Sequence, residues 1–339
     1  MHTDQKTFLK AIVGETSLPA ARAMASDIFM AADAANKADM IMIGTAANPF
    51  FVPELPAALE PAGLMSTGQL QKTVGFARAA AANTRSHRIL FTAPPKSGST
   101  FLSASLADVL GLRRVTLTLS SIVPYAHALF GGATNEQAVD ELALLGNCLH
   151  PQGFIAHHHM TCSPLLADQL GVYGVRPILA SRNIFDSLVS FDDHFRKAIP
   201  RTEGSIMLRH GLPADFLARE FDDRIAILID LKLAWYVKYY MSWMACERAG
   251  LVKPLWIHYE QDVLGSKQEL AEKVASALRL PPDRQTALAA AFAKEGSEVL
   301  NVNKGIAGRG TAITGENRQR VADCLLRYRS EVDLEFLLT

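Results

Sequence analysis

A short loop rich in hydroxyl, glycine and lysine side chains is the first part of the chain whose residue types could do chemistry. Residues 91–102 read FTAPPKSGSTFL, in which two prolines and Lys-Ser-Gly-Ser-Thr separate two apolar runs. Gly98 allows a close turn, and the amides at the start of a following helix point at an anion. Lys96 adds positive charge, and three hydroxyl donors flank the glycine: Ser97, Ser99 and Thr100. The stretch is typical of a loop that holds a phosphate or a similar anion.

The position of the lysine separates this loop from that of an ATPase. The ATPase loop reads Gly-x-x-x-x-Gly-Lys-Ser/Thr, where the lysine reaches the β/γ-phosphates and the hydroxyl holds magnesium. Alignment on Gly98 puts Ser99 at the lysine position and Thr100 at the hydroxyl position, while Lys96 precedes the glycine by two residues. The loop therefore suits a single phosphate beside a transferring group, contacted by Lys96 without a metal.

Three adjacent histidines could handle a proton. The stretch GFIAHHHMTCSP contains His157, His158 and His159, and it begins like a strand. Alternation along a strand places His157 and His159 on one face and His158 on the other. An imidazole with an unperturbed pKa of about 6.5 can accept a proton at neutral pH. The same run could instead bind zinc with further ligands, or consist of satisfied polar residues at a strand edge.

The stretch PPKSGSTFL resembles the 5′-phosphosulfate loop of sulfotransferases that use 3′-phosphoadenosine 5′-phosphosulfate (PAPS). In that family an arginine ends a strand, a serine follows eight residues later in the next helix, and both hold the 3′-phosphate. Here SRNIFDSLVS supplies Arg182 and Ser190 at that spacing, and the resemblance covers residues 88 to about 335. The resemblance implies that Arg182 and Ser190 bind the donor. It implies the same for the residues of the first loop: Pro95, Lys96, Ser97, Gly98, Ser99, Thr100 and Phe101.

A third motif of the family matches in part. Its late loop reads Arg-Lys-Gly-x-x-Gly-Asp-Trp, and the corresponding stretch here is NKGIAGRG, residues 303–310. Lys304 and Gly305 match, whereas Asn303 replaces the first arginine and Arg309 begins the pair that replaces Asp-Trp. Lys304 or Arg309 could take over the missing arginine's contact with the 3′-phosphate. We interpret this glycine-rich stretch as a mobile loop that closes over the donor.

The resemblance also implies a catalytic base. Well-known members carry a Lys-x-His pair at a strand end, roughly two dozen residues before the 3′-phosphate arginine. His159 lies 23 residues before Arg182 and matches the histidine, so His157 takes the place of the lysine. His158 is the alternative base if the strand ends one residue earlier. Lys96 would stabilise the charge that develops on the oxygen bridging to the departing 5′-phosphate.

The implied activity is transfer of a sulfuryl group from PAPS to a hydroxyl or amine of a small-molecule, lipid or carbohydrate acceptor. The other product would be adenosine 3′,5′-bisphosphate, and no metal is needed. A P-loop kinase or nucleotide hydrolase is the competing class, and the displaced lysine counts against it. A third reading is a catalytically silent relative that binds nucleotide or a partner, which the altered late loop keeps open.

The elements that must position these residues alternate along the second part of the chain. Residues 87–339 read as a sulfotransferase-like domain of three α/β layers around a mostly parallel sheet, where ligands sit beyond the strand C-terminal ends. The expected strands are 88–93, 114–119, 153–159, 176–182 and 254–259. The expected helices are 99–110, 135–147, 183–198, 224–250, 267–280 and 282–294. Residues 1–86 form an alanine-rich, mainly helical extension for packing, a lid or oligomer contact, with an irregular proline-rich piece at 48–64.

Composition limits the partners and the compartment. The net charge is zero, with 34 basic and 34 acidic side chains, which argues against nucleic acid as a partner. The four cysteines are scattered, which fits a reducing compartment. We expect a soluble cytoplasmic protein without a signal peptide or membrane span, since no apolar stretch reaches about 18 residues. The sequence leaves open whether the protein forms a homo-oligomer.

Overall fold

The computed structural model describes residues 3–13, 15–17, 19–21, 23–24, 31, 40, 67–84, 86–118, 138–201, 205–294, 308–329 and 334–338. The chain divides into two compact units. The first comprises Met1–Thr84, Thr116–Gly132 and Val139–Leu149, and the second comprises Arg85–Val115, Ala133–Ala138 and His150–Thr339. Within the described ranges, no helix is long and apolar enough to cross a membrane.

The first unit is helical where it is described. Its helices are α1 (Thr3–Ile12), α4 (Thr67–Ala82) and α7 (Glu141–Leu149). Helix α4 packs against α7, and Arg78 donates two hydrogen bonds of 2.6 and 2.8 Å to the Glu141 carboxylate. Helix α7 begins later than the predicted 135–147, because the Asp140 carboxylate accepts from the amide of Leu142 at 2.8 Å and caps the helix there. The proline-rich piece at 48–64 lies outside the described residues.

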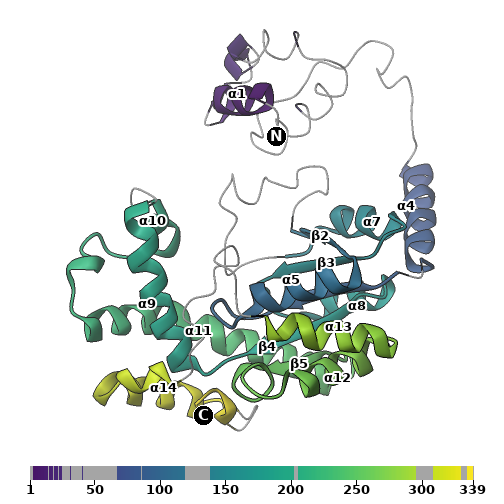
Figure 1. Ribbon diagram of the computed structural model, residues 1–339. Helices are drawn as coiled ribbons and strands as arrows, with labels where there is room; N and C mark the ends of the chain where they lie inside the picture. Colours follow the sequence, from purple (N-terminus) through teal and green to yellow (C-terminus); the bar gives the residue numbers. More distant parts are fainter. Residues whose placement is uncertain are drawn as a thin grey trace. The chain divides into compact units, whose positions relative to one another are not determined.

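The second unit contains a five-stranded sheet. Its strands are β1 (Arg88–Thr92), β2 (Arg113–Val115), β3 (Phe154–His158), β4 (Arg176–Ser181) and β5 (Leu255–His258). They lie in the order β2-β3-β1-β4-β5, and every neighbouring pair is parallel (Figure 1). The predicted α/β class with a mostly parallel sheet is confirmed. All five carboxyl ends therefore meet at one edge of the sheet.

Helices cover both faces of this sheet. They are α5 (Ser99–Leu110), α8 (Pro164–Val172), α9 (Ile184–Arg201), α10 (Ser205–His210), α11 (Phe221–Arg248), α12 (Lys267–Leu278), α13 (Pro282–Ala293) and α14 (Gly315–Leu326). Helices α5, α12 and α13 share one core with alternate strand residues, among them Ile89, Phe91 and Ile155. Helices α8 and α11 lie behind the sheet in Figure 1, and Trp243 of α11 donates to the Met160 carbonyl just beyond β3, at 2.9 Å. The sheet is thus buried on both sides, as its apolar strands require.

Strand β2 is shorter than the predicted 114–119. It ends at Val115, and the hydroxyls of Thr116 and Thr118 then hydrogen-bond to each other at 3.1 Å. The amide of Thr118 also donates to the Thr116 hydroxyl at 3.4 Å. Threonine side chains that bond to nearby backbone offer the chain an alternative to a strand ladder, which explains the early end.

Candidate functional site

The loop between β1 and α5 has the backbone of an anion-binding turn. Lys96 and Gly98 both have a φ of 73°, so two left-handed residues flank Ser97. Left-handed backbone beside right-handed backbone turns successive amides toward one point, and the first amides of α5 have no partner within the helix. A Cβ at Gly98 would come within 2.7 Å of the Tyr259 ring. A left-handed lysine is strained, and such strain is common at functional sites.

Ser97 strengthens this assignment. Its side chain is fully buried, and its Oγ is a buried polar atom with no hydrogen-bond partner in the described part of the chain. A buried hydroxyl without a partner costs free energy unless something satisfies it. An oxyanion held by the loop amides would supply the missing acceptor. Ser99, by contrast, is already engaged, with its Oγ 2.8 Å from Nε2 of His157.

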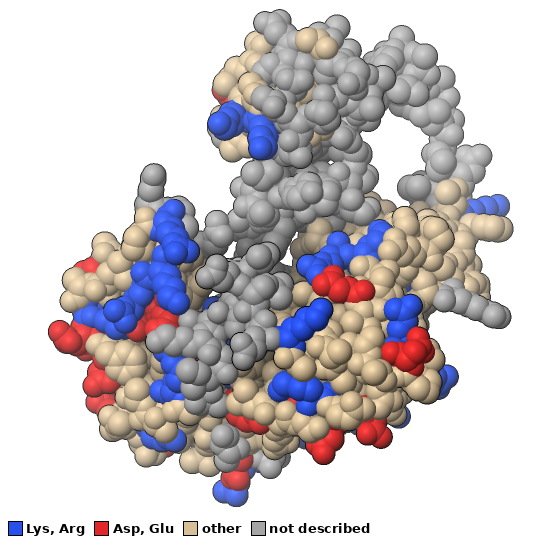
Figure 2. All heavy atoms as spheres, viewed as in Figure 1, with Lys and Arg blue, Asp and Glu red and all other residues tan. Residues whose placement is uncertain are grey.

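Positive charge converges on the loop. Burial is the main cause that lowers the pKa of Lys96 to about 8, and the nearby charges of Arg182 and Lys197 act in the same direction. Asp193 opposes them, but its carboxylate already accepts a 2.6 Å hydrogen bond from Arg309. Figure 2 shows Lys and Arg side chains gathered over α9. A chain of zero net charge thus concentrates cations where an anion could balance them.

Arg182 ties the end of β4 to the loop. Its Nη1 donates to the Lys96 carbonyl at 2.8 Å, and its guanidinium lies over the Tyr259 ring, 4.5 Å from the centroid. Asp186 lies one turn further on, 4.0 Å from Nη2 of Arg182. Ser190, the other predicted 3′-phosphate residue, is buried in the second turn of α9. Arg182, the loop and the start of α9 therefore form one connected region.

Tyr259, the first residue after β5, also belongs to this region. Its ring packs against Gly98 on one side and Arg182 on another. The neighbouring Glu260 accepts a hydrogen bond from the amide of Asn183 at 3.0 Å, so the same stretch also anchors the start of α9. The contact of Tyr259 with the loop forms only on folding and has no local signal in the sequence.

The late glycine-rich stretch is described only from Gly308 onward, so Lys304 and Gly305 lie outside the described residues. The amides of Gly308 and Gly310 donate to the two carboxylate oxygens of Asp186 at 2.9 and 2.6 Å. A Cβ at Gly310 would lie 2.4 Å from the Cβ of Phe185, so no larger residue fits at this position. Arg309 forms an ion pair with Asp193, which lies on α9, the helix that also carries Ser190.

The histidines at the end of β3 separate as strand alternation predicts. The rings of His157 and His159 touch edge to face with centroids 5.2 Å apart, and His158 is buried. Burial, followed by the nearby charges of His159 and His158, holds the pKa of His157 well below its usual value. His157 is therefore neutral, so it would not supply the positive charge of the lysine to which the resemblance matches it. Lys96 and Arg182 remain as cations of the site.

Nδ1 of His159 lies 2.6 Å from the carbonyl oxygen of Ala93. A carbonyl only accepts hydrogen bonds, so Nδ1 carries a proton, and the neutral form of the ring has its lone pair on Nε2. This is the tautomer that a proton-accepting histidine needs. The contact also fixes the ring at the start of the anion-binding loop, because Ala93 immediately follows β1.

His194 is a further titratable group that sequence reasoning missed. It lies on α9 beside Asp193, and its pKa is lowered to about 4 by partial burial and by the positive charges of Lys96 and Lys197. Its position relative to Lys96 depends on how α9 packs, so the sequence carried no signal for it. Among the described residues, no group of three or more His, Cys, Asp or Glu side chains could hold a metal ion.

Fold and site together define an α/β protein with a left-handed turn after β1 and a histidine pair at the carboxyl edge of its sheet. No family model matches the chain, and a search of curated proteins also found no match. Among solved structures, the chain is similar to the mouse sulfotransferase SULT7A1 complexed with PAP, with 16% identity and a TM-score of 0.46. The similarity covers 80% of this chain and 91% of that one. A likeness this distant identifies neither activity nor acceptor here.

Proposed function

We propose that this protein is a PAPS-dependent sulfotransferase. The observation that carries the proposal is the loop at the end of β1, where the buried Ser97 hydroxyl lacks a partner beside the cations Lys96 and Arg182. Such a loop suits one phosphate group and an adjacent transferring group. The histidine pair directly beside it adds a means of removing a proton from an acceptor.

The donor-binding residues follow from this arrangement and from the motifs in the sequence. The loop from Pro95 to Phe101 would hold the 5′-phosphosulfate, with amides, hydroxyls and Lys96 as donors. Arg182 and Ser190 would hold the 3′-phosphate. Arg309 lies near this group through its pairing with Asp193 on α9, and we assign it, with Lys304 and Gly305, to closing the donor site.

The catalytic step uses His159 as general base. With Nδ1 committed to Ala93, Nε2 of His159 accepts the proton as the acceptor oxygen attacks sulfur. The bound donor supplies the sulfuryl group, whose bond to the 5′-phosphate oxygen breaks as the bond to the acceptor oxygen forms. Lys96 and the loop amides stabilise the negative charge left on that phosphate oxygen. His157 holds Ser99, and through it the start of α5, in position.

The kinase or hydrolase reading is not favoured. Ser99 occupies the position of the ATPase lysine, and its hydroxyl is bonded to His157 rather than presented to a triphosphate. A catalytically silent relative would not need a general base. The hydrogen bond from Nδ1 of His159 to Ala93, however, leaves Nε2 as the nitrogen that can accept a proton.

The proposal is tested by incubating the protein with ³⁵S-labelled PAPS and a panel of phenols, sugars, lipid head groups and amines. Mass spectrometry would identify a sulfated acceptor, and release of adenosine 3′,5′-bisphosphate would match it in amount. A parallel reaction with ATP and magnesium measures phosphoryl transfer. We expect sulfate adducts and no phosphate adducts; phosphorylation, or bisphosphate release without a matching adduct, would contradict the proposal.

A further inference from the structure

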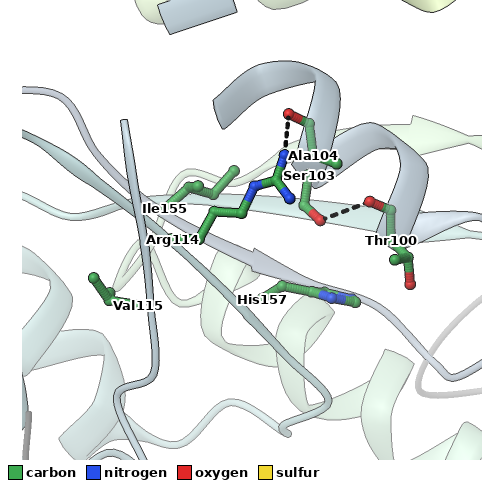
Figure 3. Close-up of a pocket in the computed structure, with 7 residues that line it drawn as sticks. All are labelled: Thr100, Ser103, Ala104, Arg114, Val115, Ile155 and His157. Carbon is green, nitrogen blue, oxygen red and sulfur yellow. Dashed lines mark hydrogen bonds between the residues drawn. The ribbon is translucent and has the colours of Figure 1, made fainter. Parts of the chain in front are cut away.

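A small pocket lies beside the candidate site, between α5 and the strands β2 and β3 (Figure 3). Its volume is about 190 Å³, and its polar lining consists of Thr100, Ser103, Arg114 and His157. The rest of the lining is small or apolar: Ala104, Val115 and Ile155. Pockets for whole drug-sized ligands measure roughly 300–1,000 Å³, so this one suits the reactive end of a molecule.

The strand order places this pocket opposite the donor anchors. Along the sheet, Arg114 comes from β2, His157 from β3, the anion loop follows β1, and Arg182 follows β4. The groups assigned to the donor's 3′-phosphate thus lie on the β4 side of the loop. The pocket lies on the β2 side, and His157 forms part of its wall. A molecule in the pocket would lie against His157, on the side of the loop away from the donor anchors.

The guanidinium of Arg114 still has donors to offer. Its Nη2 donates to the Ala104 carbonyl at 3.3 Å and to the Asp108 carboxylate at 2.7 Å. In the described part of the chain, its Nη1 and Nε make no hydrogen bond. The pair with Asp108 is solvent-exposed, with 55% and 74% of the two side chains accessible, and such pairs are weak. Arg114 could therefore bind a ligand without losing a strong partner.

The remaining polar groups suit a hydroxylated ligand. Ser103 donates to the Thr100 carbonyl at 3.1 Å, which leaves the lone pairs of its oxygen as acceptors. The hydroxyl of Thr100 and the imidazole of His157 complete a lining that can both donate and accept. The fork of a guanidinium matches the oxygens of a carboxylate or a phosphate. A ring with hydroxyls and one acidic group satisfies all these side chains together.

We propose that this pocket is the acceptor subsite and that Arg114 selects an acceptor carrying a carboxylate or phosphate close to the reactive hydroxyl. The inference rests on the proposed sulfotransferase function and names its substrate class. Arg114 holds the acidic group, and the hydroxyl that receives the sulfuryl group faces the histidine pair. Asp108 competes for the same guanidinium and keeps the pocket from binding any anion indiscriminately.

The test compares three acceptors that share one ring: methyl glucoside, methyl glucuronide and methyl glucoside 6-phosphate. The kcat/KM of sulfuryl transfer from PAPS is measured for each with wild type, Arg114→Gln, Asp108→Asn and Arg113→Gln. Arg113 is the matched control, because it is the preceding residue of the same strand and points to the other face. Thermal unfolding of each variant shows whether it is folded.

We expect wild type to prefer at least one acid over the neutral ring by tenfold or more, and which acid wins identifies the anion. Arg114→Gln should abolish this preference by lowering kcat/KM for the acid. Asp108→Asn should lower KM for the acid, and Arg113→Gln should behave like wild type. Equal rates for acid and neutral ring in wild type would overturn the inference, as would equal losses in the two arginine variants.

A binding measurement separates this inference from the function on which it rests. Adenosine 3′,5′-bisphosphate is first titrated against the wild-type protein by calorimetry; absence of binding would contradict the proposed function itself. With the bisphosphate bound, ligand-observed NMR then compares the three rings without need of turnover. If the bisphosphate binds and no acid is preferred over methyl glucoside, only the acceptor inference fails.

Discussion

At the scale of single residues, the tautomer of His159 decides its role. Because Ala93 holds the Nδ1 proton, removal of the side chain removes the only proton acceptor that we assign to the reaction. His159→Ala should lower the single-turnover rate of transfer by about 10²–10⁴-fold and leave affinity for adenosine 3′,5′-bisphosphate intact.

Two neighbours provide the controls for this prediction. His157→Ala should cost less, because His157 positions Ser99, and His158→Ala should act on stability, because its side chain is 3% exposed. If His158→Ala is inactive while His159→Ala transfers normally, the assignment of the base is wrong.

Lys96 gives the site a pH dependence with a definite sign. Its pKa of about 8 means that the ligand-free loop loses positive charge as pH rises through that value. Affinity for adenosine 3′,5′-bisphosphate should therefore be constant just below pH 8 and fall above it, by up to about tenfold per pH unit. Lys96→Met should bind more weakly, with no such fall, when both proteins are titrated by calorimetry between about pH 7 and about pH 9.5. Parallel profiles would show that another group titrates.

The same shift has an opposite consequence for the ligand-free fold. An unfolded lysine has a pKa of about 10.4, so between about pH 8 and that value the unfolded chain binds more protons than the folded one. The contribution of Lys96 to the free energy of unfolding must then rise with pH across this window. As pH rises above about 8, deprotonation of Lys96 therefore lowers the affinity for the bisphosphate, while the contribution of Lys96 to the free energy of unfolding rises.

At the scale of elements, the turn between β1 and α5 depends on a glycine for two separate reasons. Gly98 has a φ of 73°, and the Tyr259 ring leaves no room for a Cβ. Gly111, at the other end of α5, has a φ of 63° and open space around it. Gly98→Ala and Gly111→Ala should each cost about 1–2 kcal/mol in backbone strain.

Only the first substitution should also disturb ligand binding. An alanine at 98 displaces Tyr259, on which Arg182 stacks, so affinity for adenosine 3′,5′-bisphosphate should fall by at least about tenfold. Thermal unfolding and calorimetry of the two variants separate the two effects. Equal affinities in the Gly98 and Gly111 variants would mean that the Tyr259 contact does not position the site.

The elements that could be predicted from sequence are those whose local signals agree. The β1–loop–α5 unit combines an apolar run, turn residues and a second apolar run, and its helix Ser99–Leu110 has the predicted bounds. Tyr259 could not be predicted, because it reaches Gly98 across the sheet from the end of β5. The hydrogen bonds from the Gly308 and Gly310 amides to Asp186 likewise join parts of the chain that are separated by 122 and 124 positions. Such contacts exist only after the strands have assembled.

At the scale of the whole molecule, the first compact unit is not a single stretch of chain. Sequence composition placed a boundary between residues 86 and 87, whereas the first unit also takes in Thr116–Gly132 and Val139–Leu149. Helix α7 packs on α4, with Arg78 bonded to Glu141. Domains 1–86 and 87–339 remain a proposal, and a chain cut at residue 86 would leave α7 without the helix that covers it.

The candidate donor site, in contrast, lies wholly within the second unit. Adenosine 3′,5′-bisphosphate should therefore stabilise that unit, by about 2.7 kcal/mol at a hundred times its dissociation constant. ATP should stabilise it much less, because it lacks the 3′-phosphate that Arg182 and Ser190 are proposed to hold. A thermal-shift series with both nucleotides measures the difference, and equal shifts would remove the 3′-phosphate assignment.

Amide hydrogen exchange locates the same stabilisation along the chain. Protection caused by the bisphosphate should appear at the first turn of α5 and at the start of α9, whose amides lie closest to the proposed phosphates. Helices α4 and α7 serve as the internal reference, since they belong to the other unit. Protection that is equal in both units would mean that the nucleotide acts on a global unfolding equilibrium. Protection at α5 without α9 would leave the loop assignment standing and move the 3′-phosphate away from Arg182 and Ser190.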